Sequence, residues 1–250
     1  MILGRNQILV TGGAGFIGSH TVVELIENGF EPIIIDDFRN SEELILDGIE
    51  QIVKENIKIH RVDLTDYLGV RRVFEKYNFS GIIHFAAYKA VGESVEQPIN
   101  YYRNNLNALL NTAELALEFG VFNFIFSSSC TLYEVPEDGA AVNEEMPLCN
   151  PDSPYAATKS MGERMLQDIV RSNKEFKVLS LRYFNPIGAH ESGLIGELPQ
   201  GKPNNLLPFI TQTAMGKLDE LTVFGNDYNT EDGTCTVSYT HLRAHETLVH

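Results

Sequence analysis

The feature that most constrains this chain is a glycine-rich segment near its N-terminus. Val10–Gly18 follows a short apolar run and opens a helical pattern, with glycines at Gly12, Gly13, Gly15 and Gly18. In dinucleotide-binding sheets, glycines at this spacing supply a tight turn, room for a pyrophosphate against the backbone, and close helix–strand packing. A glycine-rich turn without a ligand is the alternative. The surrounding pattern therefore has to decide between them.

Short apolar runs alternate with longer helical patterns along the chain. The runs are nearly continuous Val, Ile, Leu and Phe, which is typical of strands buried on both faces of a parallel sheet. This alternation predicts an α/β fold with a Rossmann-type doubly wound parallel sheet. The expected strands are Gln7–Val10, Pro32–Ile35, Ile57–Val62, Gly81–Phe85, Phe122–Phe126 and Lys177–Leu181, and the expected helices are Gly15–Asn28, Glu42–Lys54, Tyr67–Tyr77, one within Ile99–Phe119, and Ala156–Asn173.

The pattern changes after Asn185, where Gly and Pro become frequent, as in loops that wrap a ligand. We therefore predict a dinucleotide-binding domain over residues 1–185. Residues 186–250 would begin a substrate-binding domain that is incomplete.

Acidic residues close two of the expected strands. Asp36 and Asp37 end the second strand 18 and 19 residues after Gly18. A carboxylate at this position accepts hydrogen bonds from the adenosine ribose and repels a 2′-phosphate, which favours NAD over NADP. Asp63 follows the third strand and could accept a hydrogen bond from the adenine amino group. A helix N-cap before Tyr67 is the alternative for Asp63.

A second group of residues predicts proton-transfer chemistry. Tyr155 and Lys159 are four apart at a helix start, so they share one face. A nearby ammonium, together with a positive nicotinamide ring, would lower the tyrosine pKa and allow the phenol to act as a general base on a sugar hydroxyl. Ser129 stands at the end of the fifth strand, where such sheets bind ligands. Taken singly, these residues could also be a surface helix pair and a turn cluster.

Composition narrows the possible partners. The net charge of −15 argues against nucleic acid and anionic membranes, since both attract basic surfaces. No run of 18 apolar residues occurs, so no membrane span is expected. The cysteines are Cys130, Cys149 and Cys235, and their odd number and wide spacing predict neither disulfides nor a metal site. They point to a cytoplasmic protein.

Six segments, taken in order, resemble the UDP-glucose 4-epimerase family of extended short-chain dehydrogenases. The resemblance runs from about Ile8 to Cys235. It implies that Tyr155 takes the proton from the sugar 4-hydroxyl, that Ser129 bonds the same hydroxyl, and that NAD stays bound. The segments are Thr11–His20, His84–Ser94, Phe124–Tyr133, Ser153–Lys159, Leu181–His190 and Phe224–Thr234.

The resemblance also implies a set of ligand contacts and a homodimer. The catalytic residues would be Tyr155, Lys159 and Ser129. The cofactor-binding residues would be Gly12, Gly15, Phe16, Ile17, Gly18, Asp36, Asp37, Asn40, Asp63, Leu64, Phe85, Ala86, Lys89, Asn104, Tyr155, Lys159 and Tyr183. The residues that contact the UDP-sugar substrate would be Lys89, Ser129, Tyr155, Asn185, Asn204, Asn205 and Leu206. The dimer would form on the expected helices within Ile99–Phe119 and Ala156–Asn173, although their apolar residues could equally be ordinary core.

The chain departs from the family pattern at two places. Glu134 stands where the family has glycine, and Val237 stands where it has an arginine that grips the diphosphate. Within residues 236–250 only Tyr239 and His241 match the family pattern, so we expect this segment to be non-native and the chain to have little epimerase activity. Other NAD-dependent sugar-nucleotide epimerases, dehydratases or decarboxylases remain alternatives. A non-catalytic dinucleotide-binding module is an alternative of a different class.

Overall fold

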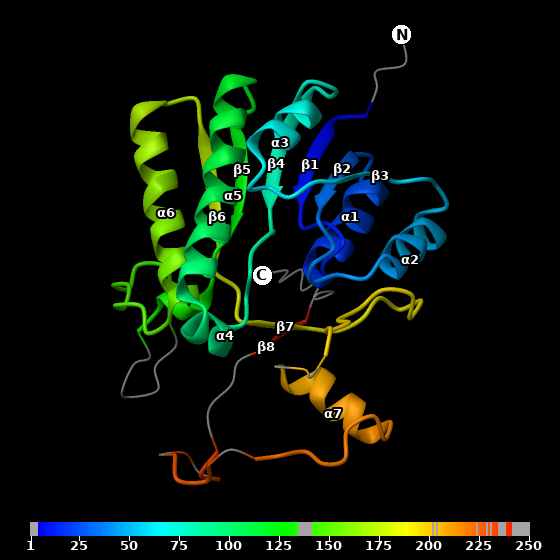
Figure 1. Cartoon of the computed structure of the whole chain (residues 1–250), viewed down its shortest axis with the longest axis vertical. Coiled ribbons are helices and arrows are strands. Elements are labelled where there is room, and N and C mark those ends of the chain that lie inside the picture. The colour runs from blue at the N-terminus through cyan, green and yellow to red at the C-terminus, as the bar shows by residue number, and fades with distance from the viewer. Residues whose placement is uncertain are drawn as a thin grey trace, which may run out of the picture.

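A six-stranded parallel sheet forms the centre of the protein in the computed structural model (Figure 1). The structure describes residues 5–134, 142–201, 203, 205–223, 225–228, 230 and 232–234, and the backbone of 239–241. The strand order is β3-β2-β1-β4-β5-β6, so the order reverses between β1 and β4, where sheets of this kind bind ligands. The strands are β1 (Gln7–Thr11), β2 (Glu31–Asp36), β3 (Lys58–Arg61), β4 (Phe79–His84), β5 (Asn123–Ser127) and β6 (Lys177–Leu181).

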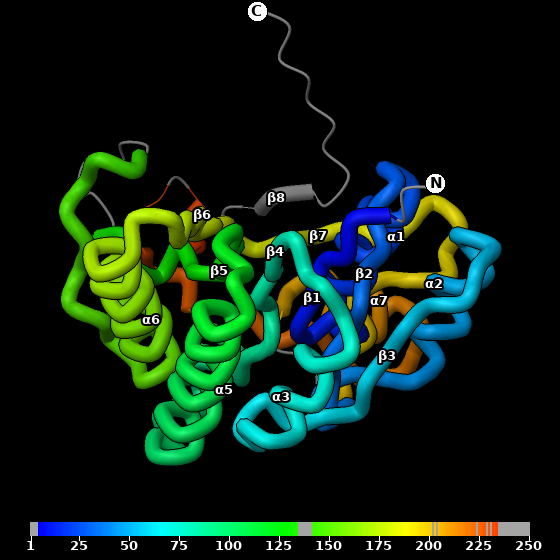
Figure 2. Tube along the Cα trace, turned by 90° about the horizontal axis from the view of Figure 1, so that it is seen from above, coloured from blue at the N-terminus to red at the C-terminus, as the bar shows by residue number. Residues whose placement is uncertain are grey.

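Helices cover both faces of this sheet, as Figure 2 shows from above. Consecutive side chains of a strand point to opposite faces, so Leu9 and Val10 of β1 enter different core clusters. Val10 packs with α1 and α2, and Leu9 belongs to the larger cluster that α3, α5 and α6 cover. The helices are α1 (Phe16–Glu27), α2 (Leu44–Val53), α3 (Tyr67–Phe74), α5 (Pro98–Glu118) and α6 (Pro154–Ser172).

The predicted doubly wound fold is confirmed. Each expected strand and helix exists, with ends that differ by at most a few residues. Two short elements lie in segments for which the sequence predicted no secondary structure. They are α4 (Val91–Glu96), which precedes α5, and the single 3₁₀ turn η1 (Cys130–Leu132), which follows β5.

The chain leaves the six-stranded sheet after β6 and forms a smaller group of elements at the carboxyl ends of the strands (Figure 1). There β7 (Asn185–Ile187) pairs in parallel with β8 (Tyr239–His241), and α7 (Leu206–Ala214) lies beyond them. Apart from the backbone of β8, the tail predicted to be non-native lies outside the described residues. The division into two domains stays a prediction.

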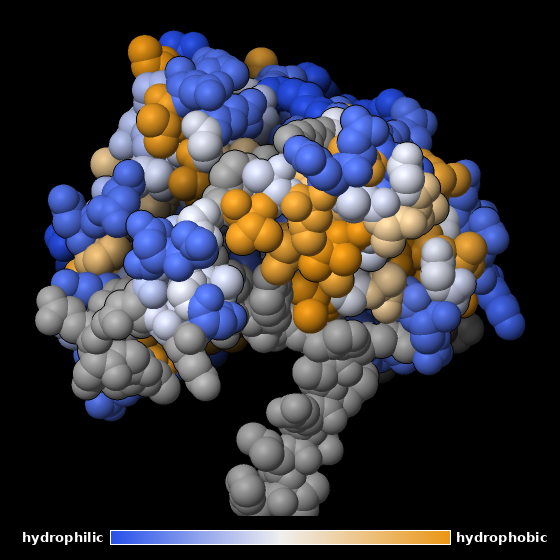
Figure 3. Space-filling model, turned by 90° about the horizontal axis from the view of Figure 1, so that it is seen from below, coloured by the Kyte–Doolittle hydropathy of each residue, from blue (hydrophilic) through white to orange (hydrophobic). Residues whose placement is uncertain are grey.

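The surface around α7 is rich in apolar side chains. Figure 3 views the molecule from this end and shows apolar residues gathered over it. Such a patch is typical of a surface that contacts something other than water. The exposed apolar residues of this segment include Leu206, Leu207, Ile210, Met215, Leu221 and Val223. In the part of the chain that the structure describes, no helix has the length and apolarity needed to cross a bilayer.

Candidate active site

The glycine-rich turn is a backbone cradle at the end of β1. Gly12 has a φ of +70°, a conformation that favours glycine, and a Cβ there would lie 2.8 Å from the amide nitrogen of Ala86. A Cβ on Gly18 would lie 2.8 Å from the Cα of Gly13. Gly15 is the N-cap of α1 and has no side chain to cover the helix N-terminus. The turn therefore exposes N–H groups at the positive end of a helix dipole, which suits a phosphate.

Asp36 connects this turn to the loop after β2. Its carboxylate accepts hydrogen bonds from the amides of Ala14 at 3.1 Å and Phe38 at 2.9 Å, and from the Ser41 hydroxyl at 2.9 Å. Burial raises the Asp36 pKa, and these hydrogen bonds oppose the shift. The carboxylate has acceptor capacity beyond these three bonds, so it can still bind a ribose hydroxyl.

Arg39 joins three loops at the same edge of the sheet. Its Nε lies 2.9 Å from an Asp37 carboxylate oxygen, its Nη1 donates to the Tyr88 hydroxyl at 2.8 Å, and its Nη2 donates to Asp63. Burial raises the pKa of Asp63, but hydrogen bonds from Thr65 and the charge of Arg39 outweigh burial and hold that pKa below its usual value. Asp63 is not the N-cap of α3, which is Asp66. The sequence gave no signal for Arg39 beyond its position next to the acidic pair.

The loop after β4 supplies further predicted cofactor contacts. Phe85 donates its amide to the Thr11 carbonyl at 3.1 Å, which places Ala86 against Gly12. Lys89 is exposed, and its Nζ lies 3.4 Å from a carboxylate oxygen of Glu197. The same oxygen accepts a hydrogen bond from the Asn205 amide. Glu197, which the sequence did not single out, thus joins two residues predicted to contact substrate.

The start of α6 presents the predicted catalytic pair. Ser153 is the N-cap, with its hydroxyl accepting from the Ala156 amide at 3.2 Å, and Pro154 begins the helix. Tyr155 lies close enough to Ser129, which follows β5, for Ser129 to lower the pKa of the phenol. Ser129 also accepts hydrogen bonds from the amide of Thr131 at 3.2 Å and from its hydroxyl at 2.9 Å. Tyr155 and Ser129 are therefore brought together, as the sequence predicted.

Lys159 lies beneath this pair, and it is almost completely buried. Its Nζ donates to the Ser127 carbonyl oxygen at 2.6 Å and lies 5.9 Å from the centre of the Tyr155 ring. Burial lowers the pKa of Lys159 to about 8. Burial also raises the pKa of Tyr155, while Ser129 lowers it. The net effect of the protein's own groups is a raised Tyr155 pKa. The predicted lowering also depends on the positive nicotinamide ring of a bound cofactor, so it stays a prediction.

Tyr183 lies on the other side of the strand end. Its hydroxyl forms a hydrogen bond with the Ser127 hydroxyl, and its carbonyl accepts from the Cys130 amide at 3.2 Å. Burial raises the pKa of Tyr183 to about 12, so this phenol stays protonated at neutral pH.

Asn104 and Asn105 link α5 to the site. Asn104, a predicted cofactor contact, donates to the Asn105 side chain at 3.1 Å. The buried Asn105 donates to the Tyr88 carbonyl and to the Thr158 hydroxyl, both at 3.1 Å. Asn105 thereby ties the loop that carries Lys89 to the helix that carries the catalytic pair. No sequence signal distinguished it from its neighbour.

The remaining predicted residues lie on several other elements of the fold. Phe16 and Ile17 begin α1, and Asn40 is exposed after β2. Leu64 is part of the core, which leaves only its backbone for a ligand. Asn185 is on β7 and Leu206 begins α7, both away from Tyr155 in sequence and in a separate layer (Figure 1). Asn204 lies outside the described residues.

Glu134, the first departure from the family pattern, does not have the positive φ that would favour glycine. Among the described non-glycine residues, only Phe38 and Lys54 have positive φ. Glu134 therefore adopts ordinary backbone geometry, and no glycine is needed there.

The described residues fit a bound dinucleotide. The cradle at Gly12 and Gly18 is space that a Cβ would fill, and the helix dipole favours a pyrophosphate there. The expected adenosine end of the site carries three carboxylates, those of Asp36, Asp37 and Asp63. It carries one guanidinium, that of Arg39, so the net charge there would repel a 2′-phosphate. The geometry thus suits NAD better than NADP.

Comparison with known proteins agrees with this site. Residues 8–245 match the model of the NAD dependent epimerase/dehydratase family. A UDP-glucose 4-epimerase of Neisseria meningitidis is 50% identical over 236 residues, which are 94% of this chain and 69% of the relative. One of Arabidopsis thaliana, UDP-glucose 4-epimerase 2, is 44% identical over 239 residues, 94% of this chain and 68% of the relative.

A solved structure matches the fold closely. It is the UDP-glucose 4-epimerase of Bifidobacterium longum in complex with NAD+ and UDP, with a TM-score of 0.91 and 43% identity, covering 95% of this chain and 70% of that one. The match of the family model, the identities and the fold lead to one conclusion. The chain belongs to the NAD dependent epimerase/dehydratase family, in which it groups with the UDP-glucose 4-epimerases.

Proposed function

We propose that this site interconverts UDP-glucose and UDP-galactose by transient oxidation at sugar C4, with NAD held in the glycine cradle. One observation carries the proposal: the Tyr155 phenol lies beside Ser129 at the carboxyl end of β5, and buried Lys159 is hydrogen-bonded to the carbonyl of Ser127 at the same strand end. A phenol paired with a strand-end hydroxyl is suited to bind and deprotonate one substrate hydroxyl. The similar proteins named above carry this activity in their names.

Each residue of the site has a distinct chemical role in the proposed reaction. Tyr155 accepts the proton of the 4-hydroxyl, and Ser129 holds that hydroxyl by a hydrogen bond. Lys159 holds an ammonium 5.9 Å from the centre of the Tyr155 ring, and together with the positive nicotinamide ring of bound NAD this charge would favour the phenolate that takes up the proton. When bound, NAD supplies a reversible hydride acceptor for C4. The glycine turn and Asp36 would hold its pyrophosphate and its adenosine ribose.

Turnover by this chain tests the proposal. Purified protein is incubated with NAD and UDP-galactose, and the formation of UDP-glucose is followed. Tyr155→Phe should reduce turnover by about 100-fold or more, because it removes the general base. Tyr67→Phe, which alters an exposed hydroxyl on α3, is the matched control and should leave turnover unchanged. The same assay tests the expectation, made from the sequence, that the chain as written has little activity.

The alternatives differ in product. Dehydratases typically carry an acidic pair near the strand-end serine or threonine to eliminate water, but this chain has Cys130 and Thr131 after Ser129. An epimerase of N-acetylated sugars would act on UDP-N-acetylglucosamine. Product analysis with both UDP-sugars separates these readings, and a dinucleotide-binding module would give no product with either.

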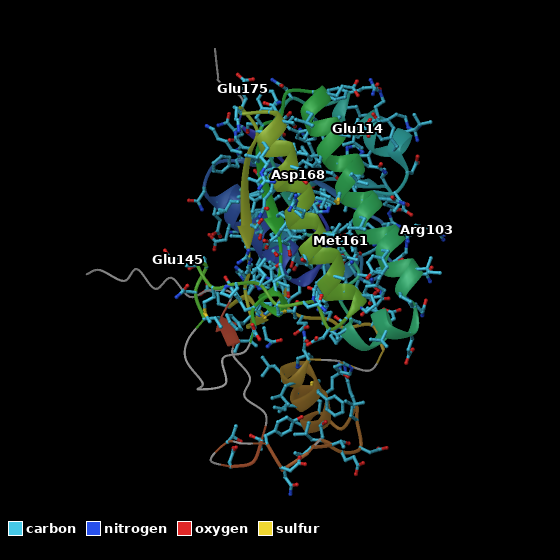
Figure 4. All side chains as sticks on the ribbon, turned by 90° about the vertical axis from the view of Figure 1, so that its left-hand side faces the viewer. Arg103, Glu114, Glu145, Met161, Asp168 and Glu175 are labelled. Carbon is cyan, nitrogen blue, oxygen red and sulfur yellow. The ribbon has the colours of Figure 1, made fainter. Side chains whose placement is uncertain are left out.

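We also propose that the protein is a cytoplasmic homodimer. Leu109 and Leu115 of α5 belong to the core, whereas Leu110 and Met161 are exposed on the outer surface of α5 and α6. Figure 4 shows Met161 on this face among charged side chains such as Arg103 and Glu114. Sedimentation of the wild type and Met161→Glu tests the dimer, because a charge in a dimer interface should give monomers. Cell fractionation tests the location.

A further inference from the structure

A buried carboxylate in α6 has no part in the proposed chemistry. Glu163 is only 4% exposed, yet its oxygens accept hydrogen bonds from Arg182 Nε at 2.8 Å and Nη2 at 2.6 Å. It also accepts a hydrogen bond from the Ser128 hydroxyl. Burial raises the pKa of Glu163, but the hydrogen bonds from Arg182 and Ser128 outweigh burial and keep its pKa below the usual value. Glu163 is therefore charged at neutral pH.

Arg182 extends this network to the loop after β6. Its guanidinium lies 5.1 Å from the centre of the Tyr133 ring, which fixes the plane of the group. The next residue along the chain is Tyr183, which bonds the Ser127 hydroxyl and the Cys130 amide. The ion pair thus joins α6, the end of β5 and the loop after β6.

All three segments carry groups of the proposed site. Ser128 stands between Ser127, whose carbonyl holds Lys159, and Ser129, which lies beside Tyr155. Glu163 lies one helical turn beyond Lys159 on the same face of α6. A single carboxylate therefore fixes the strand end relative to the helix that bears the general base.

We propose that Glu163, paired with Arg182, is a positioning residue that sets the Tyr155–Ser129 geometry through Ser128. It touches neither substrate nor cofactor in this role. The proposal rests on the catalytic assignment of Tyr155 and Ser129 made above. The physical basis is that a bidentate buried ion pair holds its partners in one arrangement, and displacement of a reacting group by about 1 Å can cost 100-fold in rate.

A loosened strand end should be visible in the titration of Tyr155. The groups that face this phenol are Lys159 on its own helix, Cys130 of η1, Tyr101 of α5 and Tyr183 of the loop after β6. Among the protein groups, Ser129 is the one that lowers the Tyr155 pKa. When Ser129 moves away from the phenol, the Tyr155 pKa rises, and the acidic limb of the kcat profile moves to higher pH because the base must be deprotonated.

Two variants test this role by different routes. Glu163→Gln removes the charge, and Ser128→Ala removes only the link to the strand and keeps the ion pair. The expected loss in kcat is about 10- to 100-fold for E163Q and smaller for S128A, with KM and bound NAD within about twofold of wild type. In both variants the acidic limb should shift upward.

The matched control is Asp168→Asn. Asp168 is on the same helix and is also paired with two arginines, Arg164 at 3.0 Å and Arg171 at 2.9 Å, but it faces solvent, as Figure 4 shows. D168N should leave kcat and the pH profile unchanged. Wild-type kcat and an unshifted limb in folded S128A would overturn the proposal, and this holds even where E163Q fails to fold.

An activity-independent measurement separates this inference from the proposed function. The phenolate absorbance of S128A minus that of the double variant S128A/Y155F isolates the titration of Tyr155. The difference between wild type and Y155F gives the reference. A higher Tyr155 pKa in the S128A background supports the positioning role, and an unchanged pKa refutes it. A wild type that binds NAD but converts no UDP-galactose would refute the proposed function and leave this titration decisive.

Discussion

The ammonium of Lys159 donates a hydrogen bond to the Ser127 carbonyl oxygen at 2.6 Å inside the protein. The side chain is 4% exposed and packs 5.1 Å from the centre of the Phe126 ring. A charge buried in this way is held at a cost in stability. The cost fits a residue selected for a charge at the site rather than for packing.

The lowered pKa of Lys159 predicts that the free energy of unfolding depends on pH in an unusual way. The pKa of Lys159 is about 8 in the folded protein, and an unfolded lysine has its ordinary higher value. Between these values the unfolded state binds more protons, so the free energy of unfolding should rise with pH by up to about 1.4 kcal/mol per unit. Urea unfolding from pH 8 to 10 should show this rise in wild type and lose it in Lys159→Met.

The exposed Lys58 provides the control for that experiment. Its hydrogen bond to Glu31 raises its pKa, so its contribution to stability is present at neutral pH and falls as pH rises through the folded value. Lys58→Met should therefore keep the upward slope that Lys159 causes. An equal slope in wild type and K159M would show that Lys159 is not the group responsible.

A methyl group in the glycine cradle should weaken NAD binding. The Cβ of Gly18→Ala would meet the backbone of Gly12 and Gly13, which cannot give way as a flexible side chain can. We expect the dissociation constant for NAD to rise by roughly tenfold or more, because the turn must shift from the pyrophosphate. Isothermal titration measures this. Gly92→Ala in α4, where a Cβ meets nothing within 4 Å, should leave binding unchanged.

Arg39 should slow the release of NAD. Its guanidinium ties the loops after β2, β3 and β4 together through Asp37, Asp63 and Tyr88. Arg39→Gln should increase the NAD dissociation rate by roughly tenfold, since the adenosine end loses its preorganisation. Stopped-flow displacement measures the rate. Arg71→Gln, which breaks a similar exposed pairing with Glu118 between α3 and α5, should not change the rate.

Replacing the buried Asn105 should destabilise the protein more than replacing an exposed asparagine does. Asn105→Ala would strand the Tyr88 amide, which donates to the Asn105 oxygen at 2.8 Å, and the partners of its side-chain nitrogen. We expect the free energy of unfolding to fall by about 2–4 kcal/mol. Asn123→Ala, which removes one exposed hydrogen bond to Ser80, should cost about 1 kcal/mol or less. Equal losses in both variants would contradict this prediction.

The sequence by itself determined the fold and the chemical groups of the site. The period of apolar residues is local, so it located every strand of the sheet, and the glycine spacing around Gly15 placed the cradle between β1 and α1. Tyr155 and Lys159 share a helix face because of their four-residue spacing alone. Ser129 could be placed beside them because strand ends meet at one edge of a parallel sheet.

Only the tertiary structure decided which polar residues join these groups. Glu163 meets Arg182 and Ser128, Arg39 meets Asp63, and Asn105 meets Thr158, each across a gap in sequence that no periodic pattern spans. Burial likewise comes from packing, which is why the raised pKa of Tyr155 could not be read from its spacing to Lys159. A local pattern specifies an element and its face, but the partner of a side chain and its exposure to water are set by how the elements pack.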